Sequence, residues 1–330
     1  MHAAVTKPLD WFSIQLARLT VHDGKSPDGQ LAAAETLLHR PEFFGDFVKA
    51  PADFEFVGKR RFRFTSPVAS PWKRNNVVHG RFFPAAKPWP AHPTVILLHG
   101  WNAEIGYRTL FPYLARRLNS VGVNVAMFEL PYHSQRKPRG RGAVRNFISD
   151  DLLHVVGAAH QSIADARALV AWLRAQSDAP VGAWGISLGG WLSGVLACVE
   201  PQLNFAVLMT PVVRMDRMIA ELDFCKAIRR SLKGARPRFD PLNLISHPLQ
   251  LAPADVLIVA SEHDLFAPID TIVELGGAWG QPELWRTRHG HISVMMSAPV
   301  MERTVGWIAA KASPSILVSI TSDMSALNNK

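Results

Sequence analysis

The first 50 residues carry apolar side chains at helical spacing. Four of them fall on one face of a predicted helix: Trp11, Phe12, Leu16 and Leu19. A second helix is predicted from residue 31 to residue 39 and ends before Pro41, because proline cannot continue a helix. We interpret residues 1–50 as an N-terminal helical flank that packs on the rest of the chain.

Strict alternation replaces this helical spacing after the flank. Phenylalanines alternate with charged side chains at Phe54, Phe56, Phe62 and Phe64. The pattern is typical of an antiparallel hairpin with one solvent-exposed face. Residues 77–83 form the next predicted strand, and the prolines that follow it predict a stiff connection.

Continuous apolar runs then alternate with helical stripes. The runs predict buried strands at residues 94–98, 123–128, 180–184, 205–209, 256–260 and 284–287, and a last helix is predicted at residues 300–310. Alternation of this kind favours an α/β fold with a mostly parallel central sheet and helices on both faces. We assign this domain to residues 51–312.

Two segments do not fit the alternation. Residues of about 212–250 lie between two predicted strands without forming a strand–helix unit, so we interpret them as a cap inserted into the domain. Residues 313–330 contain a brief apolar run and are predicted to form a C-terminal tail.

A G-x-S-x-G motif occurs where a predicted strand meets an apolar helix. Its members are Gly185, Ser187 and Gly189, and the apolar residues 188–199 follow. A serine on such a sharp turn projects its hydroxyl into a cleft, and the flanking glycines keep Cβ atoms out of the crowded approach between strand and helix. The motif therefore predicts a nucleophilic serine.

Polar residues follow several of the predicted strands directly. In a parallel sheet the carboxyl ends of the strands meet at one edge, where ligands bind. An acid follows the strand 256–260 as Glu262 or Asp264, and an imidazole follows the last strand as His289 or His291. A serine, an acid and a histidine are thus expected at one edge of the sheet, in that order along the chain.

Residues 54–312 resemble the α/β-hydrolase superfamily. The resemblance rests on His99-Gly100 after a core strand, the G-x-S-x-G elbow, an Asp after a late strand and a His before the last helix. It implies the α/β-hydrolase fold. Leu130-Pro131-Tyr132, followed by Arg136-Lys137-Pro138, is similar to a poorly characterised, esterase-like subset of these hydrolases.

The resemblance also implies a role for each residue that matches the family pattern. Ser187 corresponds to the nucleophile, His291 to the base that takes its proton, and Asp264 to the acid that orients the imidazole. The backbone N–H groups of Trp101 and Leu188 correspond to the oxyanion-hole donors.

The family pattern favours one member of each open pair. Ala267-Pro268 resembles the loop that follows the catalytic acid, which favours Asp264 over Glu262. The place directly before the last helix favours His291 over His289. His99 is expected to brace its loop, whereas His133 and His263 are expected at the surface or the rim.

The charge is unbalanced towards the basic side, with 36 Lys and Arg against 27 Asp and Glu. Basic residues cluster after a core strand and again within the predicted cap: Arg136, Lys137, Arg139, Arg141 and Arg145, then Lys226, Arg229, Arg230, Lys233, Arg236 and Arg238. Either cluster is a solvated surface or marks an anionic substrate or an anionic lipid surface. We list Arg136, Arg229, Arg230 and Asn102 as candidate substrate contacts.

Several classes of function lack their sequence signals. The histidines show no H-x-x-x-H or H-E-x-x-H pair, so neither a metal nor another cofactor is expected. No nucleic-acid-binding motif accompanies the basic clusters. The first 20 residues are too polar for a secretory signal, and no run approaches the length of a membrane span, so we expect a cytoplasmic protein.

The sequence therefore predicts a serine hydrolase acting on a small-molecule acyl substrate. A carboxylesterase or lipase-like activity on an ester or thioester is expected first, with an anionic or lipid-like substrate as a narrower hypothesis. The alternatives are a serine peptidase of the same fold and a catalytically silent binding protein on that fold.

Overall fold

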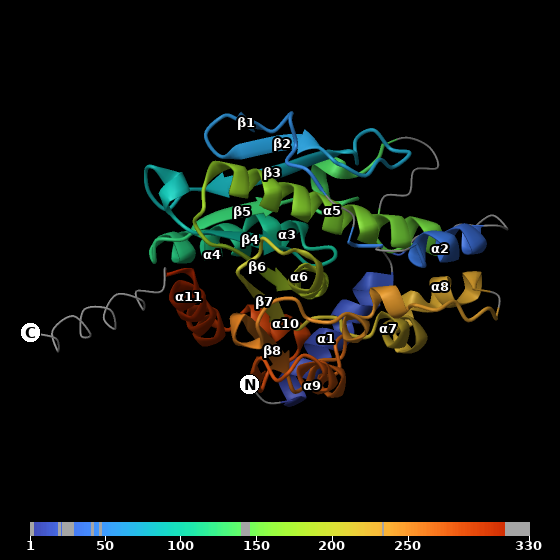
Figure 1. Cartoon of the computed structure of the whole chain (residues 1–330). Helices are drawn as coiled ribbons and strands as arrows, with labels where there is room; N and C mark the ends of the chain where they lie inside the picture. Colours follow the sequence, from blue (N-terminus) through green and yellow to red (C-terminus); the bar gives the residue numbers. More distant parts are fainter. Residues whose placement is uncertain are drawn as a thin grey trace, which may run out of the picture.

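The computed structural model describes residues 3–18, 21, 30–40, 43–45, 48–139, 146–232 and 234–313. These residues form a nine-stranded sheet in the order β1-β2-β3-β5-β4-β6-β7-β8-β9 (Figure 1). The strands from β5 to β9 in this order run parallel to one another, whereas β1, β2 and β3 are antiparallel to their neighbours. The predicted mostly parallel sheet is confirmed.

The strands lie where the apolar runs predicted them. They are β1 Glu55–Val57, β2 Arg61–Thr65, β3 Val77–Phe83, β4 Thr94–Leu98, β5 Asn124–Phe128, β6 Val181–Ile186, β7 Phe205–Met209, β8 Val256–Ser261 and β9 Glu283–Thr287. In β2, Phe62 and Phe64 are buried and the arginines between and beside them are exposed, so the hairpin has one wet face as expected.

Each face of the sheet has its own hydrophobic core, because successive side chains of a strand point to opposite sides. Val95 and Leu97 of β4 pack towards α4 (Leu110–Asn119) and α11 (Ala298–Ala312). Ile96 and Leu98 pack towards α5 (Leu152–Gln176) and α6 (Leu188–Val199). Figure 1 shows α5 and α11 on opposite sides of the strands.

The N-terminal flank contains α1 (Ala3–Arg18) and α2 (Gln30–Leu38). α2 packs on α5, and α1 packs on α10 (His291–Met295) and on the 3-10 helix Asp223–Cys225. Figure 1 shows the blue α1 among the orange and red elements from the other end of the chain. The flank is therefore built onto the C-terminal half of the fold.

The prediction of which face of α1 is buried is wrong. The buried stripe of the helix is Thr6, Asp10, Ile14 and Ala17, whereas Trp11, Phe12 and Leu16 are 58%, 56% and 49% exposed. The reason is that the surface under α1 offers backbone N–H groups to a carboxylate, described below, as well as apolar contacts. Leu19 lies outside the described residues.

Short helices fill the chain between β7 and β8. They include α7 (Met215–Glu221) and α8 (Lys226–Ser231), and α9 (Ile269–Ala278) follows β8. A cap role for residues 212–250 stays a prediction, as do the domain boundaries. The predicted tail falls outside the described residues from residue 314 onwards. Within the described ranges, the helices are all too short or too polar to cross a membrane.

Candidate active site

Ser187 lies on a sharp turn between β6 and α6, in a backbone conformation that L-residues rarely adopt (φ 59°, ψ −117°). The turn is possible because two residues beside it are glycines. A Cβ at Gly185 would collide with the carbonyl of Gly189, and a Cβ at Gly189 would collide with the carbonyl of Leu98. The motif thus has the strained strand–turn–helix geometry of a nucleophile elbow.

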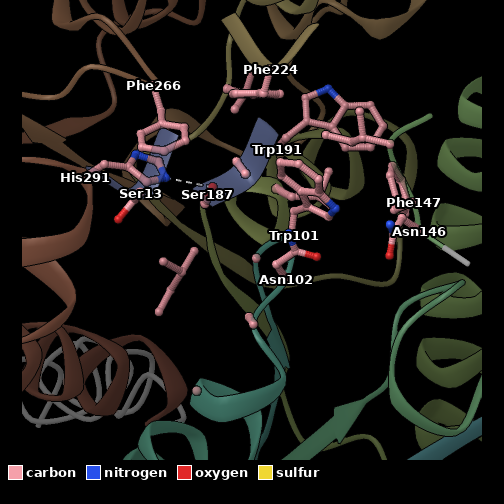
Figure 2. Close-up of a pocket in the computed structure, with 18 of the residues that line it drawn as sticks. Ser13, Trp101, Asn102, Asn146, Phe147, Ser187, Trp191, Phe224, Phe266 and His291 are labelled. Carbon is pink, nitrogen blue, oxygen red and sulfur yellow. Dashed lines mark hydrogen bonds between the residues drawn. The ribbon is translucent and has the colours of Figure 1, made fainter. Parts of the chain in front are cut away.

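Three of the predicted residues form a continuous chain of hydrogen bonds. The Ser187 hydroxyl lies 2.8 Å from Nε2 of His291, and Nδ1 of His291 lies 2.8 Å from Oδ2 of Asp264. Figure 2 shows the imidazole aimed at the serine, with the ring of Phe266 against it. The carboxylate fixes the proton on Nδ1, which leaves Nε2 as the acceptor for the serine proton.

The environment of His291 raises the pKa of its imidazole. Burial by itself lowers the pKa of an imidazole, but the Asp264 carboxylate beside Nδ1 outweighs it, with a smaller contribution from Asp10, and the pKa of His291 is raised above its usual value. Asp264 keeps its own orientation because Oδ1 accepts the backbone N–H groups of Phe266 and Ala267 at 2.7 and 2.8 Å. Both carboxylate oxygens of Asp264 are therefore engaged, one by these N–H groups and the other by His291.

The competing acid and histidine lie outside this chain of hydrogen bonds. Glu262 is exposed and lies 4.0 Å from the guanidinium of Arg288. His289 is partly exposed, and burial lowers its pKa. Geometry thus selects Asp264 and His291.

The loop after β4 lies directly against the serine. A Cβ at Gly100 would stand 3.3 Å from Cβ of Ser187. His99 braces this loop, since Nδ1 donates to the carbonyl of Gly100 at 2.7 Å and Nε2 accepts the N–H of Leu130 at 3.0 Å. Burial lowers the pKa of His99 to about 3, so its imidazole is neutral and serves as a brace.

The predicted oxyanion-hole residues flank the serine on two sides. Leu188 is the first residue of α6, where backbone N–H groups have no partner within the helix. Trp101 and Asn102 come from the loop after β4 and line the cavity beside Ser187 (Figure 2). Asn102 has a positive φ of 52°, so this loop contains a strained position as well.

The serine opens into a cavity of about 1300 Å³. Its walls come from α1, the loop after β4, α5, α6, the segment between β7 and β8, and α10. Most of the lining is apolar, and Trp101, Trp191 and Phe224 gather on one side of Ser187 in Figure 2. Two charged residues of the lining, Lys137 and Glu104, form an ion pair in which Nζ of Lys137 lies 2.6 Å from Oε1 of Glu104.

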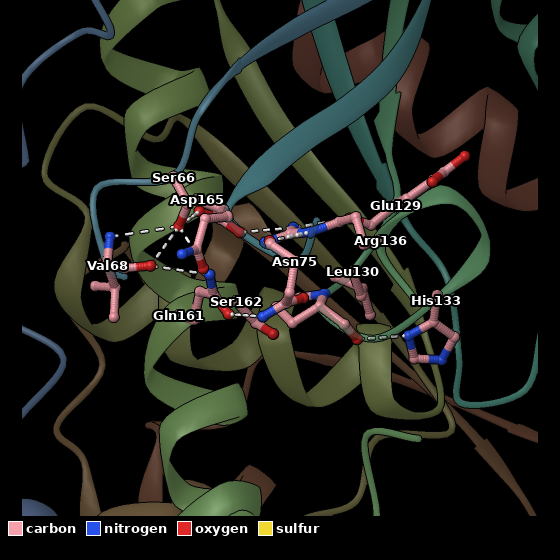
Figure 3. Close-up of polar contacts among 12 residues, drawn as sticks. Ser66, Val68, Asn75, Glu129, Leu130, His133, Arg136, Gln161, Ser162 and Asp165 are labelled. Atoms are coloured by element: carbon pink, nitrogen blue, oxygen red, sulfur yellow. Dashed lines mark hydrogen bonds and ion pairs between the residues drawn. The ribbon is translucent and has the colours of Figure 1, made fainter. Parts of the chain in front are cut away.

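Arg136 does not belong to this site, and its prediction as a substrate contact is wrong. The side chain is fully buried and its Nη1 lies 2.7 Å from the carboxylate of Asp165 in α5. The guanidinium also donates to the backbone carbonyls of Asn75 and Glu129 (Figure 3). The arginine therefore connects the loop after β2, through Asn75, and the loop after β5, through Glu129, to Asp165 of α5. His133, expected at the rim, is buried as well, and burial lowers its pKa to about 4.

Arg229 is partly buried and is not among the residues that line the cavity. Its Nη1 donates to the carbonyls of Ile219 and Leu222 at 2.6 and 2.8 Å, so it caps the C-terminal end of α7. Arg230 is exposed and lies outside the cavity lining. The other predicted basic residues Arg141, Arg145 and Lys233 lie outside the described residues.

One residue beside the site, Asp10, could not be identified from the sequence. Asp10 of α1 is fully buried, and its carboxylate accepts the backbone N–H of His291 at 2.7 Å. It belongs to no motif and stands 281 positions from the histidine. Elsewhere in the described part of the chain, no three His, Cys, Asp or Glu side chains are grouped so that they could hold a metal ion.

Sequence comparisons match the chain to one family model and to two curated proteins. Residues 69–219 match the model of the family described as alpha/beta hydrolase domain containing 18, a stretch that includes Ser187 and ends before Asp264. The uncharacterized protein Rv2627c of Mycobacterium tuberculosis (strain ATCC 25618 / H37Rv) is 29% identical over 227 residues, which is 66% of this chain and 52% of that protein. The chain thus spans about half the length of the curated relatives it matches.

Similar solved structures share the fold at low sequence identity. Acetyl xylan esterase 1 from Thermoanaerobacterium sp. JW/SL YS485 superposes with a TM-score of 0.57 at 16% identity, over 91% of this chain and 98% of that chain. The Pyrococcus furiosus esterase Pf2001 gives 0.54 at 18%, over 81% and 97%. The Pyrococcus horikoshii acylaminoacyl peptidase gives 0.53 at 13%, over 78% and 41%. The strand order and the elbow agree with these structures, so the chain has the α/β-hydrolase fold, and its residues 69–219 match the model of an alpha/beta hydrolase family.

Proposed function

We propose that this protein is a serine hydrolase that cleaves a carboxylic ester or thioester through an acyl-enzyme. The observation that carries the proposal is the hydrogen-bonded chain Ser187–His291–Asp264, which opens into a large apolar cavity. Nucleophile, base and orienting acid within hydrogen-bond reach are the geometric signature of covalent catalysis.

The proposed reaction has two halves. Oγ of Ser187 attacks the carbonyl carbon while Nε2 of His291 takes the hydroxyl proton, and the oxyanion accepts hydrogen bonds from the N–H groups of Leu188 and Trp101. Collapse expels the alcohol or thiol, which receives that proton from Nε2. Water then attacks the acyl-enzyme with Nε2 as base, which releases the carboxylic acid and restores Ser187.

The cavity favours a substrate with a long apolar acyl group. Each methylene buried in such a wall contributes roughly 0.8 kcal/mol, and the lining from α1, α5 and the segment after β7 is largely apolar. Support for an anionic substrate is weaker, because Arg136 is buried in an ion pair with Asp165 and Arg229 donates to backbone carbonyls at the end of α7. An anionic lipid surface as partner stays a prediction, which rests on the exposed Lys226, Arg230 and Arg236.

A fluorophosphonate probe tests the proposal, because it phosphonylates only an activated serine. We expect the native protein to be labelled and Ser187→Ala to remain unlabelled. Ser13→Ala is the matched control, since Ser13 lines the same cavity and its hydroxyl donates to the carbonyl of Leu9. That variant should be labelled like the native protein.

The outcomes separate the candidate functions. A native protein that takes up no label would favour the catalytically silent binding protein. Labelling of Ser187→Ala would show that another residue is the nucleophile. Matched p-nitrophenyl esters and p-nitroanilides of the same acyl groups then distinguish an esterase from a peptidase.

A further inference from the structure

We propose that Asp10 of α1 is a positioning residue that holds His291 and Asp264 in register with each other. The inference rests on the proposed function and goes beyond it, because it makes the N-terminal helix part of the active site. Its basis is a set of three hydrogen bonds from one buried carboxylate to the two segments that carry the histidine and the acid.

The contacts of Asp10 bridge those two segments. Oδ2 accepts the N–H of His291 at 2.7 Å and the N–H of Leu265, which directly follows Asp264, at 3.2 Å. Oδ1 accepts the N–H of Ile292 at 3.0 Å. Movement of either segment relative to the other would break a charge-assisted hydrogen bond in a buried place, where such bonds are strong.

A second observation shows that the chain makes room for this carboxylate. A Cβ at Gly290 would stand 2.8 and 2.9 Å from the two carboxylate oxygens of Asp10, closer than real Cβ atoms come. The N–H of Gly290 is already engaged by Oγ of Ser293 at 2.9 Å. A side chain at position 290 would therefore force the carboxylate of Asp10 or the backbone beside it to shift.

The carboxylate also acts on His291 through its charge. Burial raises the pKa of Asp10 itself, while the N–H groups of Ile292 and His291 lower it. The groups that face His291 are Asp264 from the loop after β8, Asp10 from α1 and the hydroxyl of Ser187, and the Glu104–Lys137 pair lines the same cavity. Asp10 and Asp264 both favour the protonated imidazole.

The competing interpretation is that Asp10 only docks α1. The test compares Asp10→Asn with Ile14→Ala, which removes apolar contact from the same buried stripe and leaves the carboxylate in place. Both variants should lower Tm. Only Asp10→Asn should change the chemistry, because its amide keeps one acceptor oxygen, places an NH2 donor against an N–H group in the position of the other oxygen, and carries no charge.

The rate of fluorophosphonate labelling as a function of pH is the main readout. His291 must be neutral to act, so labelling rises with pH through its pKa. Loss of the Asp10 charge lowers that pKa, and the acid limb of Asp10→Asn moves to lower pH. Its plateau rate falls about 10- to 100-fold, because a displaced base is costly. Asp10→Glu keeps the charge and should hold the acid limb near that of the native protein while the plateau falls.

A readout without catalysis separates this inference from the proposed function. In protein labelled with ¹³C-histidine, the His291 Cε1 signal is assigned by its loss in His291→Gln, and its titration should shift to lower pH in Asp10→Asn. An unlabelled native protein would contradict the proposed function. Native labelling with the same acid limb and the same His291 titration in Asp10→Asn would overturn the inference.

A second variant covers the case in which Asp10→Asn does not fold. Gly290→Ala keeps the carboxylate charge, and its Cβ should push the carboxylate away from the donors that hold it. We expect a plateau rate as low as that of Asp10→Glu, and a native plateau in Gly290→Ala would overturn the positioning role.

Discussion

The backbone of Ser187 is strained, and the small residues around it allow this conformation. A non-glycine residue in that region costs about 1–3 kcal/mol, which the surrounding structure must offset. It does so by packing β6, α6 and the loop after β4 against one another at glycines. The close packing at Gly185 and Gly189 is therefore what allows Ser187 to keep its strained backbone conformation.

Replacing Gly185 with alanine should destabilise the protein strongly. The new Cβ meets the backbone of Gly189 and not a movable side chain, so we expect a loss of about 3 kcal/mol or more in the free energy of unfolding. Urea unfolding followed by circular dichroism measures it, and esterase activity should be lost as well.

Gly157→Ala is the matched control for that substitution. Gly157 lies inside α5, and a Cβ there meets no atom within 4 Å. Alanine in a helix interior should stabilise the protein by about 0.5–1 kcal/mol. Equal effects of the two substitutions would contradict the steric account of the elbow.

The residues that sequence reasoning identified are those whose role is local. Ser187 and its glycines follow from a five-residue turn. The positions after strands narrowed the acid to Glu262 or Asp264 and the imidazole to His289 or His291, and the family resemblance selected one of each. Arg136 and Asp10 have roles that depend on partners from distant elements, namely Asp165 for one and Leu265 with His291 for the other. A basic cluster looks the same in sequence whether its members face solvent or a buried carboxylate.

The helix α1 shows that an element can be predicted correctly and its orientation incorrectly. Its length suits a helix, and its aromatic residues suggested the buried face. The orientation is set by the surface on which the helix packs, because that surface presents backbone N–H groups that the carboxylate of Asp10 accepts. The strands of the sheet were easier to predict, since buried parallel strands are apolar on both faces and leave no choice of orientation.

A substitution at Ile14 should therefore lower stability more than one at Phe12, although the sequence predicted that Phe12 lies on the buried face of α1. Ile14→Ala should cost about 2–4 kcal/mol, because Ile14 is buried against the rest of the protein. Phe12→Ser should change stability by less than about 0.5 kcal/mol, because Phe12 is largely exposed. Thermal unfolding of both variants measures the difference, and a larger loss in Phe12→Ser would restore the orientation predicted from the sequence.

The cavity is a property of the assembled molecule and of no single element. Its walls combine α1, the loop after β4, α5, the segment between β7 and β8, and α10, which meet only at the carboxyl edge of the sheet. The sequence placed the chemistry at that edge, because the strand order of parallel sheets brings strand ends together. It could not supply the volume or the apolar character of the cavity, since both depend on which faces of distant helices turn inward.

This volume predicts how activity depends on acyl length. Along p-nitrophenyl esters from acetyl to dodecanoyl, kcat/KM should rise by up to about fourfold per methylene, the equivalent of about 0.8 kcal/mol, until the apolar wall is covered. Ala159 lines the cavity from α5, so Ala159→Phe should fill part of it and reduce the preference for dodecanoyl over acetyl at least about tenfold. Ala175→Phe places the same ring on an exposed position of the same helix and should keep the native preference. A preference that is flat along the ester series, or reduced equally in both variants, would show that the acyl group binds elsewhere.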